Sequence, residues 1–172
     1  HLHDWQAGLV APLLRHHPVM GNDGFYANMR TVFTIHNLAY QGLFPPDFLA
    51  KAQLPWTLFT PEVAEFHKHL SLLKAGIVLA DQVTTVSPTY AREIQTTDYG
   101  CGLEGVLRAR ADRLTGILNG IDTRVWNPAA DPYLAAPYSA DAPDGKTVCR
   151  AALCADLGLE PQPRAPVVGI IS

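Results

Sequence analysis

Apolar and polar positions along the first 128 residues predict strands and helices in alternation. Residues 31–36 are rich in β-branched and aromatic side chains, as a buried strand should be. Two later stretches, 82–86 and 114–118, have the same character. Apolar residues at helical spacing predict helices over 5–14, 61–80, 88–94 and 104–111. This alternation predicts an α/β fold built on a parallel sheet.

The segments between these elements are rich in residues that favour turns. Residues 19–29 carry two glycines and two asparagines and are predicted to form a loop. Residues 37–61 are rich in aromatic residues and proline, which suits a long loop with short helical turns beside a binding site. Ser87 is a natural N-cap for the helix that follows it, and Pro88 stands where proline is tolerated.

The composition changes after residue 128. Residues 129–145 are rich in Ala, Pro, Asp and Tyr and are predicted to be a linker, and residues 146–157 are predicted to form a helix that Gly158 ends. Residues 167–172 have the character of a strand that opens another sheet. We therefore divide the chain into a first α/β domain over 1–128, a linker and connecting helix over 129–165, and the first strand of a second domain over 166–172.

Composition excludes several classes of protein. Of the 172 residues 48% are hydrophobic and 17% charged, and the net charge is −3, which indicates a globular chain. No basic block interleaved with aromatics predicts nucleic-acid binding, and no apolar stretch approaches the ~20 residues of a membrane span. No signal peptide is visible, and the three cysteines form no CxxC pair. We expect reduced thiols in a cytosolic protein.

Polar residues follow the predicted strands at their carboxyl ends, where open parallel sheets bind ligands. His36, Ser87 and Asn119 each occupy such a position. Asn37, Tyr40 and Gln41 follow His36 closely, so imidazole, amide and phenol groups could together bind the hydroxyls and ring of a sugar. Gly120, after Asn119, allows close approach of a ligand to the backbone.

The run His1-Leu2-His3-Asp4 has three interpretations. Two histidines and an aspartate resemble the ligand run of a zinc-dependent hydrolase, although the usual further histidine is replaced by Trp5. The same residues suit a strand end whose Asp4 caps the next helix. In the third interpretation Asp4 and its neighbours line a sugar site.

Five motifs together resemble bacterial glycogen synthases and plant starch synthases, in the order found there. They are His3-Asp4-Trp5-Gln6-Ala7-Gly8-Leu9, Val32-Phe33-Thr34-Ile35-His36-Asn37-Leu38-Ala39-Tyr40-Gln41-Gly42, Leu73-Lys74-Ala75-Gly76, Thr85-Val86-Ser87-Pro88-Thr89-Tyr90-Ala91-Arg92-Glu93-Ile94 and Gly116-Ile117-Leu118-Asn119-Gly120-Ile121-Asp122. The resemblance implies two Rossmann-like domains facing a cleft, the GT-B arrangement. It also implies retaining transfer of glucose from ADP-glucose to an α-1,4-glucan in the bacterial cytoplasm, without cofactor or essential metal.

The resemblance also implies site residues. His36 corresponds to the family's strand-end histidine, whose imidazole approaches glucosyl hydroxyls and whose carbonyl lies near the anomeric carbon. Asn119 corresponds to the asparagine that holds the glucosyl ring, and Asp4 to an acidic residue that orients a sugar. We predict these three as catalytic. The predicted substrate-binding residues are His36, Asn37, Tyr40, Gln41, Asn119, Gly120 and Asp122.

Several parts of the family's active site have no counterpart in these 172 residues. They are the Lys-x-Gly-Gly loop, the Arg and Lys that neutralise the diphosphate, and the acidic residue that grips the glucose. We therefore identify the chain as an internal fragment, inactive alone and with exposed apolar sheet edges that favour aggregation. The alternatives are a metal-dependent hydrolase that uses the first four residues and a non-catalytic carbohydrate-binding remnant.

Overall fold

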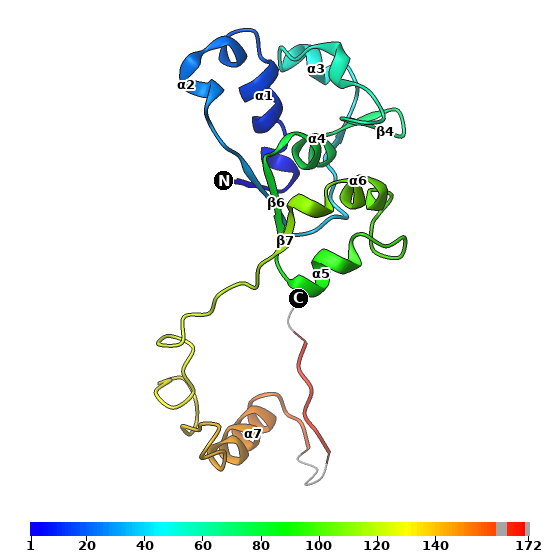
Figure 1. Ribbon diagram of the computed structural model, residues 1–172. Helices are drawn as coiled ribbons and strands as arrows, with labels where there is room; N and C mark the ends of the chain where they lie inside the picture. Colours follow the sequence, from blue (N-terminus) through cyan, green and yellow to red (C-terminus); the bar gives the residue numbers. More distant parts are fainter. Residues whose placement is uncertain (161–164, 171–172) are drawn as a thin grey trace. The chain divides into compact units, whose positions relative to one another are not determined.

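The computed structural model describes residues 1–160 and 165–170, and it divides into two compact units, His1–Asn119 and Gly120–Ser172. A four-stranded parallel sheet organises the first unit (Figure 1). Its strands, in spatial order, are β1 (Leu2–His3), β2 (Val32–Ile35), β6 (Gln82–Thr85) and β7 (Leu114–Gly116). The predicted α/β fold with a parallel sheet is confirmed.

Helices form the connections between these strands. Between β1 and β2 lie η1 (Trp5–Ala7), α1 (Val10–His16), η2 (Met20–Asn22) and α2 (Gly24–Ala27). Before β6 come α3 (Phe48–Lys51), η3 (Trp56–Leu58) and α4 (Leu72–Leu79), and between β6 and β7 come α5 (Pro88–Glu93), α6 (Glu104–Ala109) and η4 (Ala111–Arg113). Residues 19–29, predicted to be a plain loop, thus contain two short helical turns.

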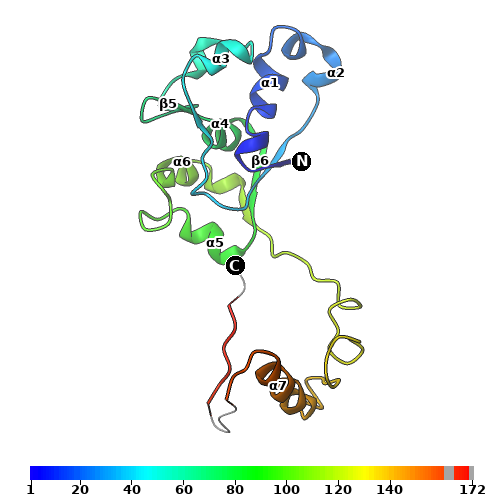
Figure 2. The same cartoon turned by 180° about the vertical axis from the view of Figure 1, so that it is seen from behind.

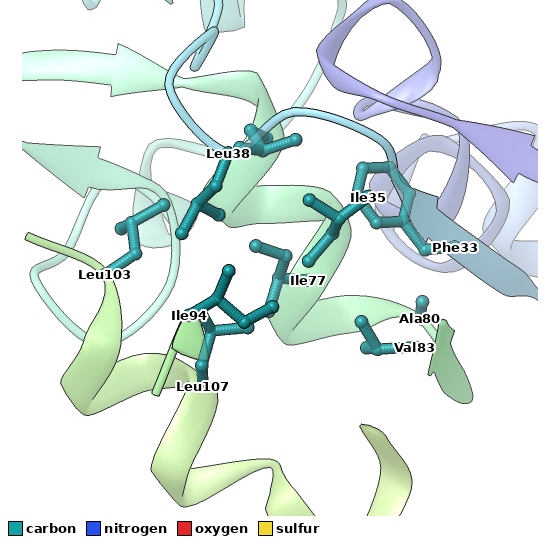
Figure 3. Close-up of a cluster of buried hydrophobic side chains, with 10 residues drawn as sticks. Phe33, Ile35, Leu38, Ile77, Ala80, Val83, Ile94, Leu103 and Leu107 are labelled. Atoms are coloured by element: carbon teal, nitrogen blue, oxygen red, sulfur yellow. The ribbon is translucent and has the colours of Figure 1, made fainter. Parts of the chain in front are cut away.

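The main core lies between the sheet and these helices (Figure 3). Phe33, Ile35 and Val83 alternate along β2 and β6, so all three face the same side of the sheet. They pack against Ile77 of α4 and Leu107 of α6, and each of the five is fully buried. This packing fixes the strands whose ends carry the predicted site.

The first half of the helix predicted over 61–80 is instead a β-hairpin (Figure 2). Strands β4 (Glu65–Phe66) and β5 (His69–Ser71) pair antiparallel, and β5 also pairs with β3 (Leu43–Phe44). His67 and Lys68 between them have φ of 48° and 67°, which a helix cannot contain. The apolar spacing of this segment suits a helix as well as a hairpin. Pairing of β5 with β3, which lies far away in sequence, favours the hairpin.

Helix α4 begins only after this hairpin. Ser71 caps it by accepting a hydrogen bond from the backbone N–H of Lys74. The Lys74 ammonium is buried and donates to the backbone carbonyls of Pro61 and Glu65, so it fastens the hairpin to the helix. Burial lowers the pKa of Lys74, although the nearby Glu65 and Glu62 carboxylates act in the opposite direction.

The second unit contains turns over residues 120–144 and the helix α7 (Gly145–Asp156), followed by Gly158 at φ +62°. The structure thus contains the helix predicted over 146–157, and the division into domain, linker and connecting helix stays a prediction. Residues 165–170 form neither helix nor strand, and Ile171 and Ser172 lie outside the described residues. The strand over 166–172 stays a prediction. Within residues 1–160 and 165–170, the structure contains no helix with the length and hydrophobicity that a membrane crossing requires.

Candidate functional site

The site forms at the carboxyl edge of the parallel sheet, where the ends of its strands meet. Asp4 directly follows β1, His36 follows β2 and Ser87 lies two residues after β6. The parallel pairing of β1 with β2 continues to Asp4, whose backbone N–H donates to the Thr34 carbonyl at 3.0 Å. Polar groups that are more than 30 residues apart in sequence therefore become neighbours.

Asp4 holds the backbone that follows β2. Its Oδ1 accepts a hydrogen bond from His36 N at 2.8 Å and lies 3.5 Å from Asn37 N. Asp4 has φ of 51°, and its side chain makes no capping hydrogen bond to η1. The interpretation of Asp4 as a helix cap is therefore wrong, because the carboxylate is directed to the neighbouring strand instead.

Three histidines lie in series beside this carboxylate. His3 Nδ1 and His36 Nε2 are 2.9 Å apart, and the ring of His1 lies 4.3 Å from that of His3. His3 pairs with Thr34, two residues before His36, so the register places both imidazoles on the same face of the sheet. His1 Nε2 also lies 2.6 Å from Thr34 Oγ1 of β2. Among residues 1–160 and 165–170 no three His, Cys, Asp or Glu side chains are arranged to hold a metal ion.

A shallow hollow of about 280 Å³ opens next to Asp4. Its lining residues are Asp4, Trp5, Gln6, Asn37 and Tyr40. Two aromatic rings, two amides and a carboxylate are the groups that bind sugar rings and their hydroxyls. The structure thus brings Asp4, Asn37 and Tyr40 together as predicted, and adds Trp5 and Gln6. The sequence placed Trp5 at the start of the helix predicted over 5–14, and one interpretation placed the neighbours of Asp4 at a sugar site.

Gln41 lies in the interior and not at the hollow. Its side-chain amide donates to the Cys101 carbonyl at 3.0 Å, and its backbone carbonyl accepts from Leu73 N at 3.1 Å. Gln41 is buried, with 9% of its surface exposed, and its substrate-binding role stays a prediction. It is placed to fasten the end of the loop over 36–41 to α4.

The other predicted residues belong to the end of the first unit or to the second. Asn119 is exposed, three residues after β7. Gly120 and Asp122 belong to the second unit, where Asp122 Oδ1 accepts from Arg124 N at 2.9 Å and Val125 N at 3.3 Å in a local turn. The substrate-binding roles of Gly120 and Asp122 stay predictions.

Gly42 shapes the wall of the hollow. It has φ of +60°, and a Cβ added there would lie 2.5 Å from the indole of Trp5. We expect Gly42→Ala to displace Trp5 and lower the melting temperature by several degrees, since strain and steric overlap act together. Thermal unfolding of the intact protein measures this. Gly105→Ala in α6 is the matched control, because a Cβ there meets nothing within 4 Å and should be neutral or slightly stabilising.

Comparisons with known proteins agree on one family. The family model for the starch synthase catalytic domain matches residues 1–109. The chain is 52% identical over its whole length to a glycogen synthase of Anaeromyxobacter dehalogenans, and 53% identical to one of Myxococcus xanthus. It spans 36% and 35% of these relatives, about a third of their length.

One solved structure is similar in fold as well as in sequence. It is the catalytic domain of starch synthase IV from Arabidopsis thaliana bound to ADP and acarbose. The TM-score is 0.77 at 38% identity, and the match covers 92% of this chain and 32% of that one.

Proposed function

Because the chain belongs to the starch synthase catalytic domain family, we propose that it forms one wall of the active site of a glucan synthase. The proposed reaction is retaining transfer of glucose from ADP-glucose to the non-reducing end of an α-1,4-glucan. The observation that carries this proposal is the hollow lined by Asp4 and by Asn37, the residue after His36, which lies within the residues that match the family. Its aromatic and amide lining suits a glucan and its hydroxyls.

In this proposal His36 is the central residue. The transition state of glucosyl transfer has oxocarbenium character, so a carbonyl dipole near the anomeric carbon stabilises it. Asp4 acts on this carbonyl through the backbone, because its Oδ1 accepts from His36 N at 2.8 Å and lies 3.5 Å from Asn37 N, the N–H of the peptide that carries the His36 carbonyl. Asn119 and Asn37 supply amides for the glucosyl hydroxyls. Fixing donor and acceptor in this geometry lowers the barrier further.

We propose ADP-glucose as donor on the strength of the similar starch synthase structure, which contains ADP. The reaction is proposed to need neither metal nor cofactor and to take place in a bacterial cytoplasm. Departure of the nucleoside diphosphate requires positive charge. None of the five residues that line the hollow is basic, so that charge must come from elsewhere in the active site.

The proposal is tested with the intact protein and a glycogen acceptor. We expect incorporation of glucose from radiolabelled ADP-glucose, with much less from UDP-glucose, and α-1,4 linkages in the product by NMR. Binding of glycogen without any transfer from either donor would instead indicate a carbohydrate-binding role.

The 172-residue chain by itself is expected to transfer no glucose. The five residues of the hollow offer no cation for the diphosphate, and leaving-group charge is the largest electrostatic demand of the reaction. The same radiolabel assay, run with the isolated chain at high protein concentration, checks this. Glucan extension above the no-enzyme background would contradict it.

A further inference from the structure

The loop that carries His36 has its backbone N–H groups bonded one after another. His36 N and Asn37 N point to Asp4, Ala39 N donates to Asn37 Oδ1 at 3.0 Å, and Tyr40 N donates to the Asn37 carbonyl at 3.3 Å. The remaining one, Leu38 N, donates to the phenol oxygen of Tyr90 at 3.1 Å. Tyr90 lies on α5, more than 50 residues away in sequence. The other hydrogen-bond acceptors belong to the loop itself or to Asp4, the residue after β1, so Tyr90 connects the loop to a separate helix.

We propose that Tyr90 is a positioning residue for the His36 loop. The inference rests on the proposed function, because the position of the loop affects the rate only if the His36 carbonyl takes part in glucosyl transfer. Leu38 is fully buried, so its N–H has no access to water if the phenol is removed. The neighbouring peptides would then shift to recover a partner, and the His36 carbonyl would move with them.

Tyr90 is itself held firmly enough for this task. Its backbone N–H donates to Ser87 Oγ at 2.8 Å, the N-cap bond that the sequence predicts. Its ring is partly buried and packs against the main core. The phenol oxygen therefore has a fixed position on a capped helix.

The same helix is packed closely against the next strand. A Cβ added at Gly116 in β7 would lie 2.2 Å from the Ser87 carbonyl, so only glycine allows α5 to approach this strand. Asn119 follows β7 by three residues. Through Tyr90, Ser87 and Gly116 the structure thus connects the loop of His36 to the strand that leads to Asn119. This packing therefore connects the strands that precede His36 and Asn119.

The test is Tyr90→Phe in the intact protein, which keeps the ring and removes only the hydroxyl. We expect kcat for glucosyl transfer to fall about tenfold, because small displacements of reacting groups are costly to the rate. The KM values for ADP-glucose and glycogen should change less than twofold. Tyr99→Phe is the matched control, since Tyr99 is 55% exposed and lies outside this network, and it should keep the wild-type kcat.

Amide hydrogen exchange read by mass spectrometry gives a second measurement that needs no activity. In Tyr90→Phe, exchange should rise in the peptide that contains residues 36–41 and stay unchanged in the peptide that contains β6. A kcat within twofold of wild type, or a rise in exchange over both peptides, would overturn the inference. If the intact wild-type protein transfers no glucose, the proposed function fails, and exchange still decides whether Tyr90 positions the loop.

Discussion

Replacing His36 by alanine in the intact protein is expected to lower kcat for glucosyl transfer by about 10²–10³-fold, because it removes the imidazole proposed to approach the glucosyl hydroxyls and leaves only the backbone carbonyl. His36 lies at the end of β2 with its side chain exposed, so the substitution leaves the core unchanged. Initial rates of glucose incorporation from ADP-glucose into glycogen measure the effect. The melting temperature should stay within about 2 °C of wild type, because exposed substitutions rarely change stability.

His16→Ala provides the matched control for this variant. His16 is also an exposed histidine, but it ends α1 and borders a hollow shared with Thr31, which precedes β2. His16 therefore lies near the start of β2 and not near its end. We expect His16→Ala to keep the wild-type rate of glucose incorporation. Activity of His36→Ala within a few-fold of wild type would remove His36 from the proposed catalytic role.

The sequence predicted the parallel sheet because strong local signals mark its strands. Three of them, β2, β6 and β7, are found within the predicted ranges 31–36, 82–86 and 114–118. The hairpin over 65–71 escaped prediction for a physical reason. Its residues have apolar spacing that also suits a helix, and their structure is decided by pairing with β3, about 26 residues earlier.

The sequence indicated several residues that lie near one another in the structure, but not the hydrogen bonds between them. Strand-end position alone selected His36, and the residues directly after it included two that line the hollow, Asn37 and Tyr40. The role of Asp4 could not be predicted, because its hydrogen bond to His36 N spans 32 residues and depends on the register of β1 against β2. The burial of Gln41 could not be predicted for a similar reason. Its partner, the Cys101 carbonyl, is 60 residues away.

Asp81→Asn is expected to lower the free energy of unfolding by about 1–3 kcal/mol. Asp81 lies between α4 and β6, with its side chain 14% exposed. Its Oδ2 accepts from Thr31 N at 2.7 Å, Thr31 Oγ1 at 3.0 Å and the Arg15 guanidinium at 2.8 Å. An amide cannot reproduce these charge-assisted bonds, and Arg15 and Arg30 would lose their shared anion. Urea unfolding of the intact protein measures the difference.

Asp112→Asn is the matched control for the loss of an acidic partner. Asp112 contacts Arg113 at 3.5 Å but is 74% exposed, so water and salt screen the pair. We expect its effect to stay below about 0.5 kcal/mol. If both substitutions lower the free energy of unfolding equally at pH 7, the hydrogen bonds and ion pairs of Asp81 contribute no more than an exposed surface charge does.

The effect of Asp81→Asn should also depend on pH in a defined direction. Burial alone would raise the pKa of Asp81, but the hydrogen bonds from Thr31 and the Arg15 guanidinium outweigh it and hold the pKa well below its usual range. The carboxylate therefore stabilises the folded protein fully above the unfolded pKa of about 3.9, and this contribution is lost as the pH falls through the folded pKa. The difference between wild type and Asp81→Asn should be constant from pH 7 to pH 5 and narrow below about pH 4. A difference that widens on acidification would contradict the assignment, because it would mean that Asp81 is protonated more readily in the folded state than in the unfolded chain.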